Sequence, residues 1–248
     1  MRLLICILTL AGLTAGELTA TDKKPLHALL ITGGCCHDYA TQKDLRKAGL
    51  EARLNIVVDH VHSHDKSTNP PLAIDGNADW AKGYDVVVHN ECFANTVDEG
   101  YIRSITHAHK EGVPAVVIHC AMHTYRASKT DDWRQFLGVT SRRHEHQSRY
   151  PVKKVALKHP ILKGMPEDWV TPKDELYVIE KMWPKARALA TSKSERDGKE
   201  YAVAWTNQYG KARVFGTTYG HSDATFSDPV FLKLVARGLL WASGELED

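Results

Sequence analysis

The stretch Pro114-Ala-Val-Val-Ile-His-Cys-Ala-Met-His-Thr-Tyr-Arg126 decides the fold class of this chain. Its apolar, β-branched run from Val116 to Ile118 is typical of a strand that is buried on both faces. Titratable side chains follow at once, beginning with His119 and Cys120. In α/β proteins, ligands bind at the carboxyl ends of parallel strands. The stretch therefore predicts a central parallel strand that leads directly into a functional site.

Apolar runs and helical patterns alternate through the first half of the chain. The patterns predict strands over 26–32, 54–58 and 85–88, and helices over 38–50 and 98–110. This alternation indicates right-handed βαβ units and a parallel sheet.

The second half has a different pattern. It predicts a short helix over 130–136 and strands over 152–157, 187–191, 201–206 and 212–217. The residues Asn207 to Gly210 are typical of a hairpin turn between the last two strands. An amphipathic helix is expected over 228–241.

Composition and length favour one domain with a real core. The chain has 248 residues, of which 43% are hydrophobic and 25% charged, and its formal net charge is +2. Lys and Arg are scattered among acidic residues, so nothing indicates a nucleic-acid partner.

The N-terminus has the features of a secretory signal. Met1 and Arg2 precede an apolar run from Leu3 to Leu13, and cleavage could follow Ala15 or Ala20. We therefore expect a signal peptide over 1–20, a single domain over 21–248, and a periplasmic or secreted protein. No later stretch is apolar enough to predict stable membrane insertion.

Cleavage would leave the four cysteines Cys35, Cys36, Cys92 and Cys120. Export would suit disulfides, but a bond between the adjacent Cys35 and Cys36 is expected to be strained. Disulfides and buried free thiols both remain open.

Polar clusters follow the predicted strands, and they account for many of the 14 histidines. The clusters are 33–38 (GGCCHD), 60–65 (HVHSHD), 89–92 (HNEC), 119–123 (HCAMH) and 217–222 (TTYGHS). If the sheet is parallel, the first four clusters lie along one edge of it.

Several of these residues have a structural alternative to a functional role. His37 and Asp38 could cap the following helix instead of contributing to a site. An exposed loop is favoured over a metal site for the alternating trio His60, His62 and His64. Two further pairs are expected to be structural. His89 and Glu91 would end a strand, and His107 and His109 would lie on the surface of a helix.

Three kinds of chemistry are compatible with these residues to different degrees. Cys120 is a weak candidate nucleophile, because Ile118 and Met122 occupy positions where a nucleophile elbow needs small residues. Zinc chemistry needs three protein ligands and an open position, and the chain offers enough candidates: His37, Asp38, His119, His123, Glu175 and His221. A metal-free acid–base site of His and Glu is equally compatible.

Taken in order, the segments resemble the ThuA-like family, which is named for trehalose utilisation. The matching segments are 29–38, 117–119, 159–164, 174–177 (DELY), 203–205 and 210–221, which ends in TTYGH. The resemblance implies a flavodoxin-like, class I glutamine amidotransferase-like three-layer sandwich with a mostly parallel sheet. It also implies a pocket formed by the segments of His37, His119, Glu175 and His221.

The family is tied to the metabolism of disaccharides and their 3-keto derivatives, so a small-molecule carbohydrate is the expected partner. Glutamine hydrolysis is not expected, because the glycines around the nucleophile and the His-x-Glu ending are missing. The Cys35-Cys36 pair and Cys120 depart from the family pattern.

We therefore expect an exported enzyme that acts on a sugar or keto-sugar as a hydrolase, lyase or isomerase. His119, His37 and Glu175 are the candidate acid–base groups or ligands of a divalent metal, and His221 would orient or bind. The candidate substrate-binding residues are Asp38, Cys120, His123, Tyr125, Tyr177 and Trp205; both tyrosines could bond to hydroxyl groups, and Trp205 could stack on a sugar. The alternatives are a non-catalytic carbohydrate-binding module and a cysteine-dependent hydrolase.

Overall fold

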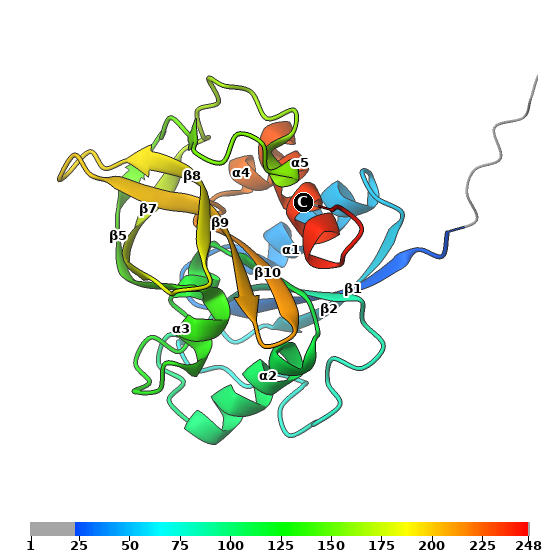
Figure 1. The fold of residues 1–248 in the computed structure, drawn as a ribbon. Helices are drawn as coiled ribbons and strands as arrows, with labels where there is room; N and C mark the ends of the chain where they lie inside the picture. The colour runs from blue at the N-terminus through cyan, green and yellow to red at the C-terminus, as the bar shows by residue number, and fades with distance from the viewer. Residues whose placement is uncertain (1–22, 248) are drawn as a thin grey trace, which may run out of the picture.

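The computed structural model describes residues 23–247, so the expected signal peptide over 1–20 lies outside the described residues. Its main feature is an eight-stranded sheet with the strand order β2-β1-β3-β4-β10-β9-β8-β6 (Figure 1). The first five strands in this order are parallel to one another: β2 (Ile56–Ser63), β1 (Leu26–Gly34), β3 (Val86–Cys92), β4 (Ala115–Ile118) and β10 (Ala212–Thr217). The predicted parallel arrangement of the first four strands is confirmed.

Each of the remaining three strands of this sheet pairs antiparallel with the strand before it in the order. They are β9 (Glu200–Tyr209), β8 (Arg187–Lys193) and β6 (Lys153–Lys154). The predicted hairpin joins β9 to β10, although β9 continues to Tyr209 and the turn is at Gly210 and Lys211.

Helices cover both faces of the sheet and complete the three-layer α/β fold that was predicted (Figure 1). One layer contains α1 (Tyr39–Glu51), α4 (Asp223–Ser227) and α5 (Pro229–Ala242), and the other contains α2 (Glu99–Glu111) and α3 (Asp132–Leu137). Val116 and Ile118 belong to the core under α5, whereas Val117, between them, packs in the core under α2 and α3. This alternation explains why the whole of β4 is apolar: both of its faces are buried.

A separate two-stranded antiparallel ribbon was not predicted. It consists of β5 (Val139–Ser148) and β7 (Asp174–Met182). The predicted strand over 152–157 is reduced to the two residues of β6. The ribbon is important for function because it brings His144, Glu175 and Tyr177 to the pocket described below.

Several histidines that were expected in loops or on the surface lie within elements. His60 and His62 are part of β2, and Nδ1 of His62 is 2.8 Å from the Thr32 hydroxyl. The loop interpretation was wrong for these two, because β2 continues beside β1 as far as Ser63. His64 follows directly after the strand.

The expectation that His109 lies on a surface was also wrong. His109 is buried: its Nδ1–H donates to the Val113 carbonyl at 2.8 Å, and its Nε2 lies 3.0 Å from Nε2 of His89. His89 in turn contacts Glu91 at 2.9 Å, and both are buried inside β3, which extends to Cys92 instead of ending before them. Hydrogen-bond partners make these buried polar groups tolerable.

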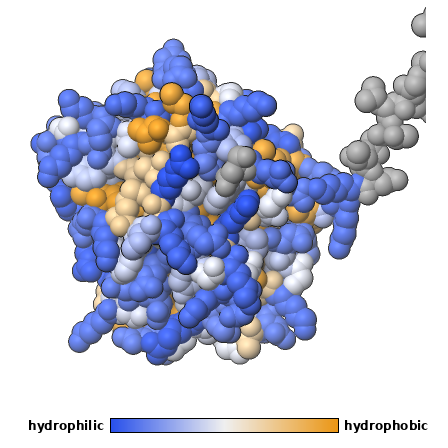
Figure 2. Space-filling model, in the orientation of Figure 1, coloured by the Kyte–Doolittle hydropathy of each residue, from blue (hydrophilic) through white to orange (hydrophobic). Residues whose placement is uncertain are grey.

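The surface of the described part is mostly hydrophilic on the face that Figure 2 shows, with small hydrophobic areas between the polar side chains. Within residues 23–247, no helix has the length and apolar character needed to cross a bilayer.

Candidate functional site

A pocket of about 280 Å³ lies where the polar clusters after β1, β3, β4 and β10 meet the β5–β7 ribbon. Its position follows from the topology, because the carboxyl ends of parallel strands share one edge. The charged, imidazole and aromatic side chains that line it are His37, His123, Arg126, His144, Glu175, Tyr177 and His221. His119 lies behind this lining, fully buried and in contact with several of them.

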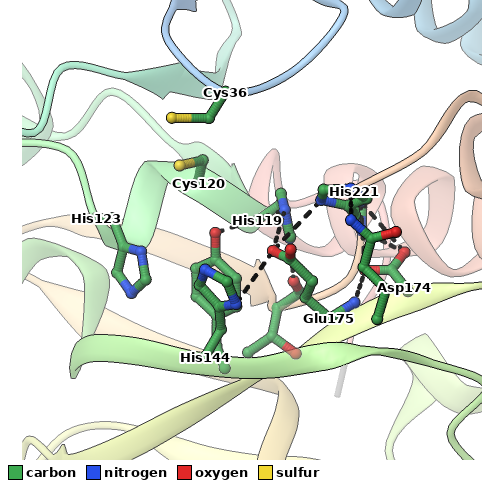
Figure 3. Close-up of polar contacts among 12 residues, drawn as sticks. Cys36, His119, Cys120, His123, His144, Asp174, Glu175 and His221 are labelled. Atoms are coloured by element: carbon green, nitrogen blue, oxygen red, sulfur yellow. Dashed lines mark hydrogen bonds and ion pairs between the residues drawn. The ribbon is translucent and has the colours of Figure 1, made fainter. Parts of the chain in front are cut away.

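Glu175 is at the centre of the group. Its Oε2 lies 3.3 Å from Nδ1 of His221, 3.5 Å from Nδ1 of His144 and 3.7 Å from Nε2 of His119 (Figure 3). Burial raises the pKa of Glu175, but the contacts with His221 and His144 outweigh it, and the net pKa lies below the usual value. The carboxyl group is therefore ionised at neutral pH and faces three imidazoles.

His119 is held in one orientation by the backbone. It begins the short 3-10 helix η1 (His119–Met122) after β4, with a φ of +50° that is unusual for a residue other than glycine. Its Nδ1–H donates to the Thr218 carbonyl at 2.7 Å, which leaves Nε2 directed at Glu175 and 3.5 Å from the Tyr177 hydroxyl. Burial, and secondarily His37, lower the pKa of His119 well below its ordinary value, so the ring is neutral.

His37 lies between two other imidazoles. Its ring centre is 4.7 Å from that of His119 and 4.9 Å from that of His221. Burial and the neighbouring His221 lower its pKa to about 4. Its Nδ1 is buried and has no hydrogen-bond partner among residues 23–247. The sequence interpretation of His37 as a cap does not hold, because Asp38 caps α1 through the amide of Thr41.

His221 is positioned by acidic and amide groups. Nε2 of His221 contacts the Gln147 amide at 2.7 Å, and Asp174 accepts hydrogen bonds from the backbone N–H groups of Gly220 and His221. The contact with Glu175 raises the pKa of His221 although burial opposes the shift. Asp174 is fully buried, which raises its own pKa to about 6 in spite of the hydrogen bonds that it accepts.

Aromatic rings form another wall of the pocket. His123 stacks on Tyr177 with 4.3 Å between ring centres, and His144 stacks on the same ring at 5.4 Å. Burial lowers the pKa of His123 to about 3 and raises that of Tyr177, so that both are neutral at physiological pH. The Tyr177 phenol can therefore donate a hydrogen bond to a bound molecule.

The predicted substrate-binding residues are divided between the pocket and other places. Cys120, His123 and Tyr177 line the pocket. Asp38 lies outside it, on an open groove of about 610 Å³ that shares Cys36, His37 and His221 with the pocket. The groove also contains Gln147 and Lys66.

Tyr125 and Trp205 are away from both hollows. Tyr125 is 3% exposed and packs against Trp133, and Trp205 is fully buried, with its indole N–H donating to the Leu137 carbonyl at 2.8 Å. Trp205 also covers Gly216, where any Cβ would lie 2.3 Å from the indole ring. The expected stacking face of Trp205 and the expected hydroxyl contact of Tyr125 are therefore not available in the structure.

The four cysteines form two disulfides, Cys35–Cys36 and Cys92–Cys120. The sequence leaves disulfides and free thiols open and predicts strain in a bond between the adjacent pair, and the structure contains this bond. Because Cys120 is bonded to Cys92, it has no thiol to act as a nucleophile in this state, which removes the basis for a cysteine-dependent hydrolase.

Sequence reasoning missed His144, Gln147 and the role of Asp174. His144 and Gln147 belong to β5, whose sequence VTSRRHEHQS has nine polar or charged residues in succession and no strand-like alternation. Asp174 was noted only as part of a motif. Its burial is what identifies it as the acceptor that holds the His221 segment.

Comparison with known proteins now adds to this geometry. The model of the family described as ThuA, trehalose utilisation, matches residues 28–242. The chain belongs to the ThuA family. The expected resemblance is confirmed, and membership of a family described by trehalose utilisation suggests a role in carbohydrate metabolism. No curated protein matches the chain.

Solved structures agree with the ThuA assignment. A ThuA-like protein from Parabacteroides merdae is 25% identical, with a TM-score of 0.71 over 91% of this chain and 92% of that one. Another, from Bacteroides uniformis, is 16% identical, with a TM-score of 0.69 over 92% and 95% of the two chains. A β-galactosidase from Rahnella sp. R3 shares the fold alone, at 16% identity and a TM-score of 0.55, over 86% of this chain and 31% of its own.

Proposed function

We propose that this ThuA-family chain is an exported enzyme that moves a proton on a disaccharide-derived sugar, with a 3-keto sugar as the preferred substrate. The observation that carries the proposal is the carboxylate of Glu175 within 3.3–3.7 Å of three imidazoles in one pocket. Family membership supports the carbohydrate class of the substrate.

The charge states of the group suit acid–base chemistry. Glu175 is ionised and can accept a proton, whereas the raised pKa of His221 lets that ring carry one near neutral pH. A keto group acidifies the hydrogen on the adjacent carbon. Glu175 would remove this hydrogen as a proton, and His221 would donate a proton to the oxygen that becomes negative. Tyr177 would donate a hydrogen bond to the same oxygen or to a neighbouring hydroxyl.

The shape of the site supports a substrate with two rings. The inner pocket of about 280 Å³ is near the lower limit of ~300 Å³ for small-molecule sites. The open groove continues from it through His37 and His221 and offers the polar side chains of Asp38 and Gln147. One ring would lie against Glu175 and Tyr177, and the second would lie in the groove.

Export is part of the proposal because of the apolar run from Leu3 to Leu13. N-terminal sequencing of the protein from its native host tests it. We expect the mature chain to begin between residues 16 and 21, and a chain that retains Met1 would contradict export.

A metal-assisted form of the same reaction is the second candidate. One nitrogen from each of His37, His119 and His221 lies within 4.8 Å of the other two. Nδ1 of His37 has no hydrogen-bond partner in the described part of the chain. Neutral imidazoles are good ligands for divalent transition metals, and the low pKa values of His37 and His119 keep both rings in this form. These residues therefore fit a metal such as Zn²⁺, which when bound would polarise a sugar oxygen.

The test measures turnover and metal content in the same preparations. Wild-type protein is incubated with 3-keto-trehalose and with trehalose, and products are followed by mass spectrometry. We expect conversion of the keto sugar and a loss of roughly 100-fold or more in Glu175→Gln. Glu180→Gln is the matched control, because Glu180 is on the same strand, its side chain is 40% exposed, and it forms a loose surface ion pair with Arg142 at 3.7 Å.

The outcomes separate the alternatives. Binding of the sugar without any turnover would contradict the enzyme and favour a carbohydrate-binding module. Stoichiometric metal in the wild type that is lost in His119→Ala would select the metal-assisted form. Turnover by metal-free protein would select proton transfer by Glu175 and His221 alone.

A further inference from the structure

The four cysteines of the described chain gather at one wall of the pocket. Cys35 and Cys36 follow β1, Cys92 ends β3, and Cys120 lies in η1 after β4. All four line the pocket of Glu175. Beyond the two disulfides, Sγ of Cys35 lies 3.7 Å from Sγ of Cys92. Sulfur atoms of the two disulfides are therefore in direct contact.

The backbone is built for this contact. The loop after β1 passes so close to Cys92 that a Cβ on Gly34 would lie 2.4 Å from the Cys92 carbonyl oxygen. The backbone N–H of Cys35 donates to this same oxygen at 3.4 Å. Gly34 has a φ of +87° and Cys36 a φ of +84°, so the turn uses backbone conformations that residues other than glycine rarely adopt. The position of Cys35 against Cys92 is thus fixed by the backbone and not by the side chains alone.

The two disulfides differ in exposure. Cys36 is exposed and Cys35 is partly exposed, whereas Cys92 and Cys120 are 2% and 3% exposed. A protein-sized reductant can therefore reach the first disulfide but not the second. Figure 3 shows Cys36 and Cys120 on the same side of the site, together with His123.

We propose that this cluster is a dithiol–disulfide exchange site that takes two electrons from an external protein dithiol at Cys35–Cys36 and passes them to Cys92–Cys120. A thiolate of the external dithiol attacks Cys36, and Cys35 leaves as a thiolate. The second external thiol then releases Cys36, so the external dithiol leaves as a disulfide and Cys35–Cys36 is reduced.

The second half of the exchange is internal. Cys35 attacks Sγ of Cys92 across the 3.7 Å contact, the Cys92–Cys120 bond breaks, and Cys120 leaves and takes up a proton. Cys36 then attacks Cys35, which re-forms Cys35–Cys36 and releases Cys92 as a thiol. The net result is that two electrons and two protons pass from the external dithiol to Cys92 and Cys120.

This exchange does not depend on the proposed sugar chemistry. It would, however, alter a wall of the candidate active site, because Cys92 and Cys120 line the pocket with His123 and Tyr177. Opening the buried disulfide would separate two sulfur atoms there without any change in Glu175.

The test follows each disulfide during reduction by thioredoxin, with its reductase and NADPH as the electron source. Samples of the oxidised chain are quenched in acid, alkylated and analysed by peptide mass spectrometry. We expect the double variant Cys35→Ser/Cys36→Ser to open Cys92–Cys120 more slowly than wild type by roughly tenfold or more. A smaller change, or four free thiols in the air-oxidised wild type, would overturn the proposal. The control is reduction by a phosphine in denaturant, which must open Cys92–Cys120 equally in both proteins. It establishes that the double variant still contains this disulfide.

The single variant Cys36→Ser provides a second, independent test. It leaves Cys35 with a thiol but removes the residue that resolves the intermediate. We expect a trapped Cys35–Cys92 disulfide and an alkylated Cys120 in its peptide map. A map with Cys35 alkylated and Cys92–Cys120 intact would overturn the proposal.

Discussion

The carboxylate of Asp174 accepts the backbone N–H of His221 at 3.2 Å, and through this bond it fixes the imidazole that faces Glu175. The same carboxylate accepts the Gly220 N–H at 3.0 Å and the Thr225 hydroxyl at 2.6 Å. Asp174 and Glu175 are adjacent on β7 but have different roles. Asp174 organises the segment after β10, and Glu175 presents its charge to the pocket.

Replacement of Asp174 by Ala should therefore weaken the fold and the site together. It removes the acceptor of three backbone N–H groups, those of Glu175, Gly220 and His221, and of the Thr225 hydroxyl. We expect a loss of about 3 kcal/mol in the free energy of unfolding. Urea unfolding measures the loss, and turnover should fall as His221 loses its position. Asp168→Ala, at an exposed position, is the control and should change neither quantity. Unchanged stability in Asp174→Ala would refute the positioning role.

The pH dependence of turnover should reflect His221, Asp174 and His37. The pKa of His221 is raised by Glu175, so this ring keeps its proton to a higher pH than an ordinary imidazole and loses it as the pH rises through the raised pKa. The rate should fall along this alkaline limb. On the acid side, Asp174 takes up a proton near its pKa of about 6, which weakens its hold on the His221 segment, so the rate should begin to fall near pH 6. His37 takes up a proton only near its pKa of about 4 and should add a second loss there.

His221→Gln checks this assignment, because glutamine can still bond to Glu175 but does not titrate. We expect a lower rate and no alkaline limb in the variant. An alkaline limb at the same pH in both proteins would assign it to a different group.

The buried His109 should make folding stability depend on pH. Burial lowers its pKa to about 3, whereas in the unfolded chain it titrates at 6.5. Between these two pKa values the unfolded state binds more protons than the folded state. The contribution of His109 to the free energy of unfolding is therefore fully present above pH 6.5 and is lost as the pH falls from 6.5 towards 3. From pH 7 to pH 5 this one group should cost about 2 kcal/mol of the free energy of unfolding.

Comparison with His109→Phe isolates this contribution. Phenylalanine preserves the stack on Phe136, where the ring centres are 4.4 Å apart, but does not titrate. Urea unfolding at both pH values should show a smaller pH dependence in the variant by about 2 kcal/mol, whatever its stability at pH 7. Equal pH dependence in the two proteins would contradict the buried neutral state.

The sequence was most informative where local pattern and burial coincide. Val116 to Ile118 are apolar because both faces of β4 are covered, and the strand ends at His119 because the site begins there. The parallel order then brings His37 and His119 to one edge. This part of the site could be predicted from strand periodicity and topology alone.

The rest depended on contacts between distant segments. The polar β5 forms a strand only because it pairs with β7, and this pairing delivers His144 beside Glu175. The aromatic pattern could not show that Trp205 faces the core, since a stacking residue and a core residue look alike in sequence. Likewise, the bond between Cys35 and Cys36 and its contact with Cys92 are set by the backbone path after Gly34.

The most direct test of the central claim is solvent hydrogen exchange on a 3-keto disaccharide, followed by NMR in deuterium oxide. The account predicts that wild-type protein and Glu180→Gln incorporate deuterium at the carbon next to the keto group, and that Glu175→Gln is slower by roughly 100-fold. Exchange at the same rate in Glu175→Gln would show that this carboxylate is not the base. No exchange with the wild type above the uncatalysed rate would contradict proton transfer in this pocket altogether.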